Sequence, residues 1–191
     1  KVMTATSGPG FILYADPYGW ALGCETPAVV LNSGRVGPVS GITGAPGQGE
    51  FYLMRYPTQG GNFETICLAP NSAQECMAMT VEAFYLAERF RMPVSVLADQ
   101  LITDGFEDIS VPENENEMQE MGFRTWPRKV CQGPNFYPAT DELDIPPVVL
   151  GHNTGAMCSD WTPTEEGYDI EEVEAHHKHA YRLIYKVRNN R

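Results

Sequence analysis

The sequence is poor in basic residues and lacks a long apolar run, and each shortage excludes a class of protein. It has 13 Lys and Arg against 25 Asp and Glu, which gives a formal net charge of −12. Nucleic-acid backbones and anionic membranes both bind basic surfaces, so we expect neither as a partner. No apolar stretch reaches the roughly 20 residues of a transmembrane helix, and no signal-peptide pattern opens the sequence.

Cysteine is also scarce, and its five positions are far apart: Cys24, Cys67, Cys76, Cys131 and Cys158. An odd number without a close pair disfavours a disulfide framework, a zinc site or a complete set of iron–sulfur ligands. It fits a reducing compartment, so we expect a cytoplasmic protein with no metal site of its own.

The remaining composition is that of a globular protein. A chain of 191 residues with 42% hydrophobic side chains fits one domain, or one domain with an extension. Lys1 already lies in a strand-like run, so we expect the natural chain to have residues upstream of this sequence.

Strand-like and helix-like segments alternate in the first hundred residues. Four apolar runs of the kind typical of buried parallel strands are residues 1–7, 27–32, 63–69 and 94–99. Helices are predicted for residues 11–24 and 72–91. The second begins with a capping box, in which Ser72 and Glu75 would each bond the other's backbone N–H. We predict an α/β fold with a mostly parallel sheet flanked by helices.

The first predicted strand ends in the turn Gly8-Pro9-Gly10. Glycines allow the backbone to approach a ligand closely, and ligands bind at the carboxyl edge of open α/β sheets. On geometry alone the turn is more typical of an ordinary connection between a strand and a helix than of a ligand site. Residues 33–49 hold six glycines and two prolines, and a structureless loop of this length is usually functional. Its single charged residue, Arg35, could hold a substrate carboxylate or pair with a carboxylate of the protein.

We divide the chain into residues 1–104, an α/β domain, residues 105–168, an arm, and residues 169–191, a final helix. The arm is acidic from Glu107 to Glu120 and then rich in proline and glycine, with possible anchors at Trp126, Phe136, Tyr137 and Trp161. Three histidines of the final helix, His176, His177 and His179, are interpreted as an exposed polar face rather than a metal site, because adjacent residues point to different faces.

Several motifs, taken in order, resemble one known family. Thr4-Ala5-Thr6-Ser7-Gly8-Pro9-Gly10, then Arg35-Val36-Gly37-Pro38 with Gly41, then Gln48-Gly49-Glu50, are similar to the alpha subunit of 2-oxoacid:ferredoxin oxidoreductases of the 2-oxoglutarate synthase type. Ala69-Pro70-Asn71-Ser72 and Pro93-Val94 continue the similarity, which covers nearly the whole chain.

The resemblance implies a thiamine-diphosphate fold, here the pyrimidine-type module, incomplete at its N-terminus. It implies oxidative decarboxylation of a 2-oxoacid to an acyl-CoA, with thiamine diphosphate shared with a beta subunit, coenzyme A as co-substrate and ferredoxin as electron acceptor. Mg²⁺ and a [4Fe–4S] cluster would lie on partner subunits. The implied cofactor-binding residues are Thr6, Ser7, Gly8, Pro9 and Gly10. The implied substrate-binding residues are Arg35, Thr43 and Gln48.

The sequence also departs from this family. Val36, Val39, Ser40, Thr43 and Gly44 replace the family's usual loop residues, and the glutamate that activates the cofactor lies upstream of the opening motif in the family. The residues that carry catalysis are therefore not identified within this chain. An alternative interpretation is a divergent, noncatalytic assembly subunit of the same kind of complex.

Overall fold

The computed structural model describes residues 1–61, 63–124, 136–137 and 157–190. A five-stranded sheet forms its centre, with four parallel strands in the order β1-β2-β5-β4 and an antiparallel β3 on β2. The strands are β1 (Met3–Ser7), β2 (Ala28–Val36), β3 (Ile42–Pro46), β4 (Ile66–Leu68) and β5 (Pro93–Asp99). The longer helices are α2 (Ala15–Gly23), α4 (Ala73–Phe90) and α7 (Val173–Arg188). The short ones are α1 (Pro9–Ile12), α3 (Phe51–Arg55), α5 (Gln100–Thr103) and α6 (Glu115–Glu120).

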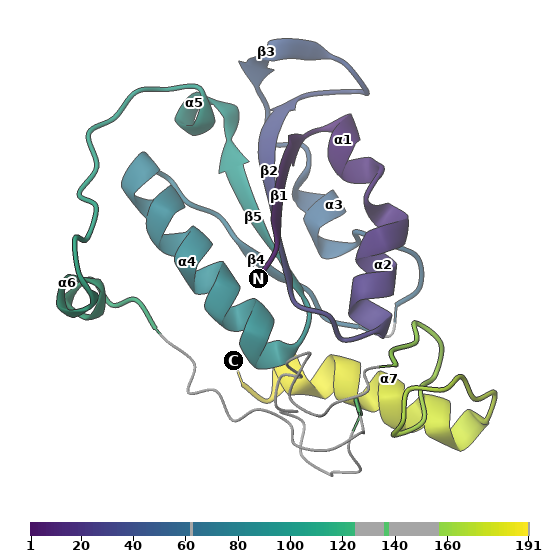
Figure 1. Ribbon diagram of the computed structural model, residues 1–191. Coiled ribbons are helices and arrows are strands. Elements are labelled where there is room, and N and C mark those ends of the chain that lie inside the picture. Colours follow the sequence, from purple (N-terminus) through teal and green to yellow (C-terminus); the bar gives the residue numbers. More distant parts are fainter. Residues whose placement is uncertain (62, 125–135, 138–156, 191) are drawn as a thin grey trace.

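Helices cover both faces of the sheet, which confirms the predicted α/β fold. α4 lies on one face and α1, α2 and α3 lie on the other (Figure 1). Val94 and Val96 of β5 belong to the cluster under α4, whereas Ser95 between them bonds the Tyr18 hydroxyl of α2 at 3.1 Å. Both faces of β5 are therefore buried, as its uninterrupted apolar sequence predicts.

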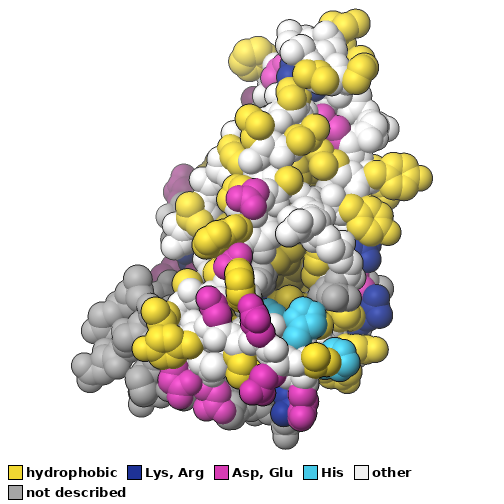
Figure 2. All heavy atoms as spheres, turned by 90° about the vertical axis from the view of Figure 1, so that its right-hand side faces the viewer, with side chains coloured by type: hydrophobic (Ala, Val, Ile, Leu, Met, Phe, Trp, Pro, Cys, Tyr) yellow, Lys and Arg dark blue, Asp and Glu magenta, His cyan; other side chains and the backbone are white. Residues whose placement is uncertain are grey.

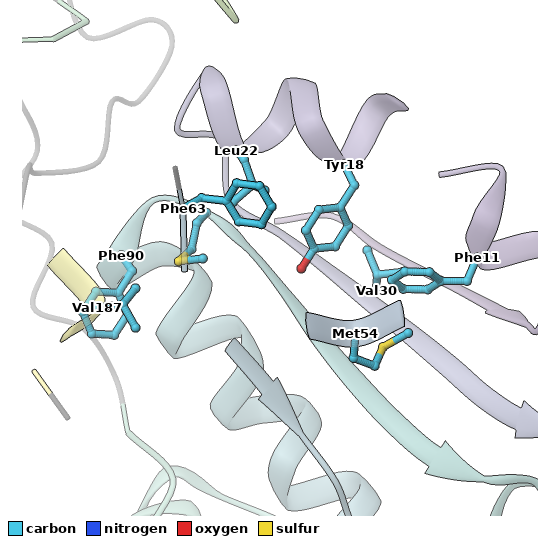
Figure 3. Close-up of a cluster of buried hydrophobic side chains, with 9 residues drawn as sticks. Phe11, Tyr18, Leu22, Val30, Met54, Phe63, Phe90 and Val187 are labelled. Carbon is cyan, nitrogen blue, oxygen red and sulfur yellow. The ribbon is translucent and has the colours of Figure 1, made fainter. Parts of the chain in front are cut away.

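The larger hydrophobic cluster fills the face beneath α1–α3. Phe11 of α1, Tyr18 of α2 and Met54 of α3 converge on Val30 of β2 (Figure 3). Phe90 and Val187 extend the same cluster toward α7. The final helix is thus fastened to the end of the core rather than to the middle of the sheet.

α4 begins at the predicted cap, with one difference. The Glu75 backbone N–H donates to the Ser72 hydroxyl at 3.1 Å, as the capping box predicts. The Glu75 carboxylate, however, accepts from the backbone N–H of Asn71, at 2.9 Å, and not from that of Ser72. The reciprocal bond is therefore displaced by one residue along the chain.

Residues 33–49 do not form the structureless loop that their glycines and prolines suggest. β2 continues to Val36, and β3 folds back on it as an antiparallel partner, with an irregular register between Arg35 and Val36. The two arms approach closely because Gly34 and Gly47 have no side chains: a Cβ on Gly34 would lie 2.8 Å from the Gly47 carbonyl oxygen. The two strands approach so closely at Gly47 that a residue with a side chain would not fit there without a shift of the backbone.

Replacing Gly47 with alanine is expected to lower the free energy of unfolding by about 1–3 kcal/mol, as overpacking against rigid atoms usually does. The new Cβ would lie 2.6 Å from the Arg35 carbonyl carbon, which is backbone and cannot move aside cheaply. Gly44→Ala is the matched control, because no atom lies within 4 Å of a Cβ at Gly44. Chemical denaturation of both variants measures the difference, and equal stabilities would contradict the close packing of the hairpin.

α7 is held by a buried group of charged side chains, which we name the Glu25 cluster: Glu25, Arg91, His179, Arg182 and Lys186. The Glu25 carboxylate accepts from Arg182 Nε at 2.7 Å and from Lys186 Nζ at 3.3 Å, and its side chain is 1% exposed. Glu25 and Arg91 both have left-handed backbones, with φ of 49° and 47°, at the ends of α2 and α4. The two helices thus end where α7 crosses them.

The C-terminal third is described only in part. The helix predicted from Asp169 begins at Val173, because Asp169 instead forms an isolated bridge with Pro163. Residues 107–111 are exposed, and they are held to the start of α4, where the Ala73 N–H donates to the Glu107 carboxylate at 2.7 Å; α6 follows. Tyr137 is buried and Trp161 is 54% exposed, whereas Trp126 and Cys131 lie outside the described residues.

Candidate functional site at the carboxyl edge of the sheet

The turn after β1 brings a bare stretch of backbone to the carboxyl edge of the sheet. Gly8 adopts φ 43°, a conformation that side chains disfavour, and it is followed by Pro9 in the single turn of α1. A Cβ on Gly8 would lie 3.0 Å from Arg35 Nε and 3.1 Å from Glu50 Oε1. Gly8 is therefore the point at which the first strand, Arg35 and Glu50 meet.

Arg35 lies near the end of β2, close enough to Glu50 to lower the pKa of that carboxyl. Within the described residues, no carboxylate oxygen lies within 4.0 Å of its guanidinium, and its buried Nε has no hydrogen-bond partner. Of the alternatives open from the sequence, this geometry favours an arginine that binds an incoming anion over one that pairs with the protein.

Asn32 and Glu50 form a polar pair beside Arg35. The Asn32 side-chain amide donates to the Glu50 carboxylate, and Asn32 is fully buried. Its other side-chain atom, Oδ1, has no hydrogen-bond partner among the described residues. A buried acceptor without a partner costs free energy, so a ligand group that donates a hydrogen bond would be favoured here.

Burial raises the pKa of the Glu50 carboxyl, whereas the Asn32 amide and the Arg35 side chain and backbone N–H lower it. The net direction is upward from the ordinary value. Glu50 is thus a carboxyl group that takes up a proton more readily than an exposed glutamate, in contact with the turn at Gly8.

The eight residues proposed for binding fall into two groups in the structure: six lie together at the carboxyl edge, and two have contacts elsewhere. Thr6 pairs with Asn32 across β1 and β2, so Thr6, Ser7, Gly8, Pro9 and Gly10 share the edge with Arg35. The contacts of the other two lie toward β5 and α5. The Thr43 carbonyl accepts from the Gln100 amide at 2.7 Å, and the Gln48 amide donates to Asp99 at 3.1 Å.

Sequence reasoning missed Asn32 and Glu50 as site residues. Glu50 belongs to the motif Gln48-Gly49-Glu50, from which sequence reasoning selected Gln48 alone. Asn32 could have been found from the sequence, because it is a polar residue at the end of an apolar strand run, where ligands bind in open α/β sheets.

Exposed apolar side chains surround this edge. Figure 2 shows hydrophobic side chains gathered around charged ones at the β3 end of the molecule and scattered down the face of α1–α3. The most exposed of them near the edge are Leu13, Val39, Ile42, Phe51 and Tyr52, each at least 64% exposed. Apolar surface of this extent around a polar centre is typical of a protein–protein contact.

Two pockets lie elsewhere, between α2 and α7. One, of about 470 Å³, is lined by Trp161, His176, His179 and neighbouring residues, and the other, of about 430 Å³, by Trp20, Phe63 and neighbouring residues. Neither includes Gly8, Arg35 or Glu50.

The sequence suggested that the three histidines of α7 form an exposed polar face, but one of them is buried. His176 and His177 are exposed, but His179 is 7% exposed and lies 3.8 Å from the Glu25 carboxylate. The reason is the helical register, which places His179 in line with Arg182 and Lys186. No group of three or more His, Cys, Asp or Glu side chains suited to a metal occurs in the described part of the chain.

Comparison with known proteins assigns the chain to a family. Residues 1–180 match the family described as pyruvate flavodoxin/ferredoxin oxidoreductase, thiamine diphosphate-binding. The chain is 35% identical over 191 residues to 2-oxoglutarate synthase subunit KorA of Methanocaldococcus jannaschii, covering all of this chain and 50% of that protein. It is 39% identical over 117 residues to ketoisovalerate oxidoreductase subunit VorB of Methanothermobacter marburgensis, covering 61% of this chain and 33% of that protein.

A solved structure agrees. The 2-oxoglutarate:ferredoxin oxidoreductase of Magnetococcus marinus, with 2-oxoglutarate, coenzyme A and succinyl-CoA bound, superposes with a TM-score of 0.74 at 25% identity. The match covers 98% of this chain and 33% of that one. The fold is thus that of a thiamine-diphosphate-binding α/β domain.

The chain belongs to the pyruvate flavodoxin/ferredoxin oxidoreductase family, in its thiamine-diphosphate-binding part, which confirms the family resemblance. It spans about half the length of the KorA subunits that it matches over its whole extent. No helix among the described residues is both long and apolar enough to cross a membrane.

Proposed function

We propose that this chain forms one wall of the active site of a 2-oxoacid:ferredoxin oxidoreductase, in which Arg35 binds the carboxylate of the 2-oxoacid. The observation that carries the proposal is the Arg35 guanidinium, which has no carboxylate partner among the described residues and lies beside the turn at Gly8. Arginine can hold a carboxylate by two parallel hydrogen bonds, which fixes its orientation as well as its charge.

The residues at the edge suit thiamine diphosphate as the cofactor. Thr6, Ser7, Gly8, Pro9 and Gly10 would line its cleft, since Gly8 leaves the backbone bare and Asn32 Oδ1 offers an unused acceptor. When bound, this cofactor supplies the carbon centre that adds to the carbonyl of a 2-oxoacid and retains its electrons after loss of carbon dioxide. Arg35 would orient the substrate carboxylate, and Glu50 with Asn32 would keep the polar wall beside it in place.

The rest of the reaction would depend on other subunits. The exposed apolar rim around the edge supports closure by a second polypeptide, which we identify with the beta subunit of the same enzyme. That partner would carry Mg²⁺ and the [4Fe–4S] cluster, ferredoxin would accept the electrons, and coenzyme A would accept the acyl group. Thr43 and Gln48 are secondary candidates for substrate contact, because their present contacts lie toward β5 and α5.

Arg35→Ala in the assembled enzyme is expected to raise KM for the 2-oxoacid at least tenfold, equal to about 1.4 kcal/mol of lost charge-assisted binding. The assay is reduction of a viologen dye across a panel of 2-oxoacids. Arg35→Lys should give an intermediate KM, because it keeps the charge but not the forked geometry.

Arg124→Ala is the matched control, since its side chain is 61% exposed and lies near Glu82, on another part of the surface. It should leave KM unchanged. Unchanged kinetics in Arg35→Ala would remove Arg35 from the substrate site and would favour the alternative of a noncatalytic assembly subunit.

A further inference from the structure

Two cysteines that are 134 positions apart in sequence lie together in the fold. Cys24 caps the C-terminus of α2, and Cys158 precedes the bridge that leads to α7. The Cys158 thiol is near enough to Cys24 to contribute to the raised pKa of Cys24, and both thiols are free. Neither residue belongs to the site at the carboxyl edge.

Backbone contacts hold the two segments side by side. The hydroxyl of the buried Tyr137 donates to the carbonyl oxygens of Cys24, at 3.1 Å, and Ser159, at 3.3 Å. A Cβ on Gly23 would lie 2.7 Å from the Asp160 carbonyl oxygen. The approach of the two thiols is therefore fixed by their neighbours on both sides rather than by the side chains alone.

The two thiols differ in accessibility. Cys158 is exposed, whereas Cys24 is 7% exposed. Burial, together with the neighbouring Cys158, raises the pKa of the Cys24 thiol to about 12. An oxidant from solution would therefore meet Cys158 first, and Cys24 would react second and slowly.

We propose that Cys24 and Cys158 form a reversible disulfide when the protein meets a low-molecular-weight disulfide, and that this bond fastens residues 157–160 to the end of α2. The Cys158 thiolate attacks the small disulfide, forms a mixed disulfide and releases one small thiol. The Cys24 sulfur then attacks Cys158 Sγ, and the second small thiol leaves and takes up the Cys24 proton. Two protein thiols are oxidised and one small disulfide is reduced to two thiols.

The test uses the full-length subunit in its assembled complex, incubated without oxygen with oxidised glutathione, then alkylated, digested without reductant and analysed by mass spectrometry. We expect glutathione on Cys158 first, followed by a peptide in which Cys24 is linked to Cys158. Conversion should accelerate about tenfold per pH unit from pH 7 to 9, because the thiolate fraction of Cys24 rises in that proportion. Dithiothreitol should reverse the link.

Variants separate this pair from other thiols. Cys24→Ala should remain glutathionylated at Cys158, and Cys158→Ala, at an exposed position, should form neither product. Cys67→Ala is the matched control and should keep the link, since Cys67 lies in β4. A link from Cys158 to Cys131 or to another subunit, or glutathionylation of unaltered protein that never converts at pH 9, would overturn the proposal.

Discussion

Glu25→Ala is expected to lower the free energy of unfolding by about 3–5 kcal/mol, because removing one member of a buried ion pair leaves its partners uncompensated. Arg182 and Lys186 both donate to Glu25, and Lys186 is 2% exposed. Burial alone would raise the pKa of Glu25, but Lys186, Arg182 and Arg91 outweigh it and hold the pKa at about 2. Burial lowers the pKa of Lys186, and Glu25 restores part of it.

Chemical denaturation of the full-length subunit measures this effect, and Glu25→Gln tests the charge while preserving most of the shape. Glu174→Gln is the matched control in α7, because its ion pair with Lys178 is 76–82% exposed and should contribute less than about 0.5 kcal/mol. A loss of under 1 kcal/mol in Glu25→Ala would show that the Glu25 cluster does not fasten α7.

The second large effect is a loss of stability between about pH 6.5 and pH 4, caused by His179. Burial, supported by the charges of Arg182, Lys186 and His176, lowers the pKa of His179 to about 4, although the Glu25 carboxylate acts in the opposite direction. In the unfolded chain, His179 therefore takes up a proton near pH 6.5, whereas in the folded chain it does so only near pH 4. The contribution of His179 to the free energy of unfolding is complete above pH 6.5, its pKa in the unfolded chain. It is lost as the pH falls toward 4, by up to about 3 kcal/mol.

The measurement is the free energy of unfolding as a function of pH for the unaltered protein and two variants. His179→Gln should flatten the slope between pH 6.5 and 4, because glutamine keeps an acceptor for Arg182, which now donates to His179 Nδ1 at 3.2 Å, without titrating. His177→Gln, at an exposed position of the same helix, should keep the slope. Equal slopes in all three proteins would remove His179 as the cause.

Local sequence patterns were sufficient to predict the parallel strands of the sheet and its longest helix, α4. Apolar runs bounded by Gly and Pro predicted the parallel strands, and Ser72 marked the start of α4, because burial on two faces and helix capping leave signals within a few residues. The strand predicted at 63–69 is only Ile66–Leu68, since strand ends depend on the neighbour that provides hydrogen bonds.

The features missed from the sequence depend on distant partners. β3 lies in a segment whose glycines suggested a loop, and the close contact of Gly47 with the Arg35 backbone becomes apparent only in the folded chain. Likewise, the contact of His179 with the Glu25 carboxylate joins residues that are far apart in the sequence. The Asn32–Glu50 pair at the candidate site is also separated by the whole hairpin.

The distance along the chain between Glu25 and its cations has a consequence for synthesis. Arg182 is 157 residues downstream of Glu25, and Lys186 is 161. At about 5–20 residues per second, a ribosome needs roughly ten to thirty seconds to add the intervening segment. During that interval the nascent sheet must keep the Glu25 carboxylate hydrated, so the end of α2 can close only after the last helix leaves the exit tunnel.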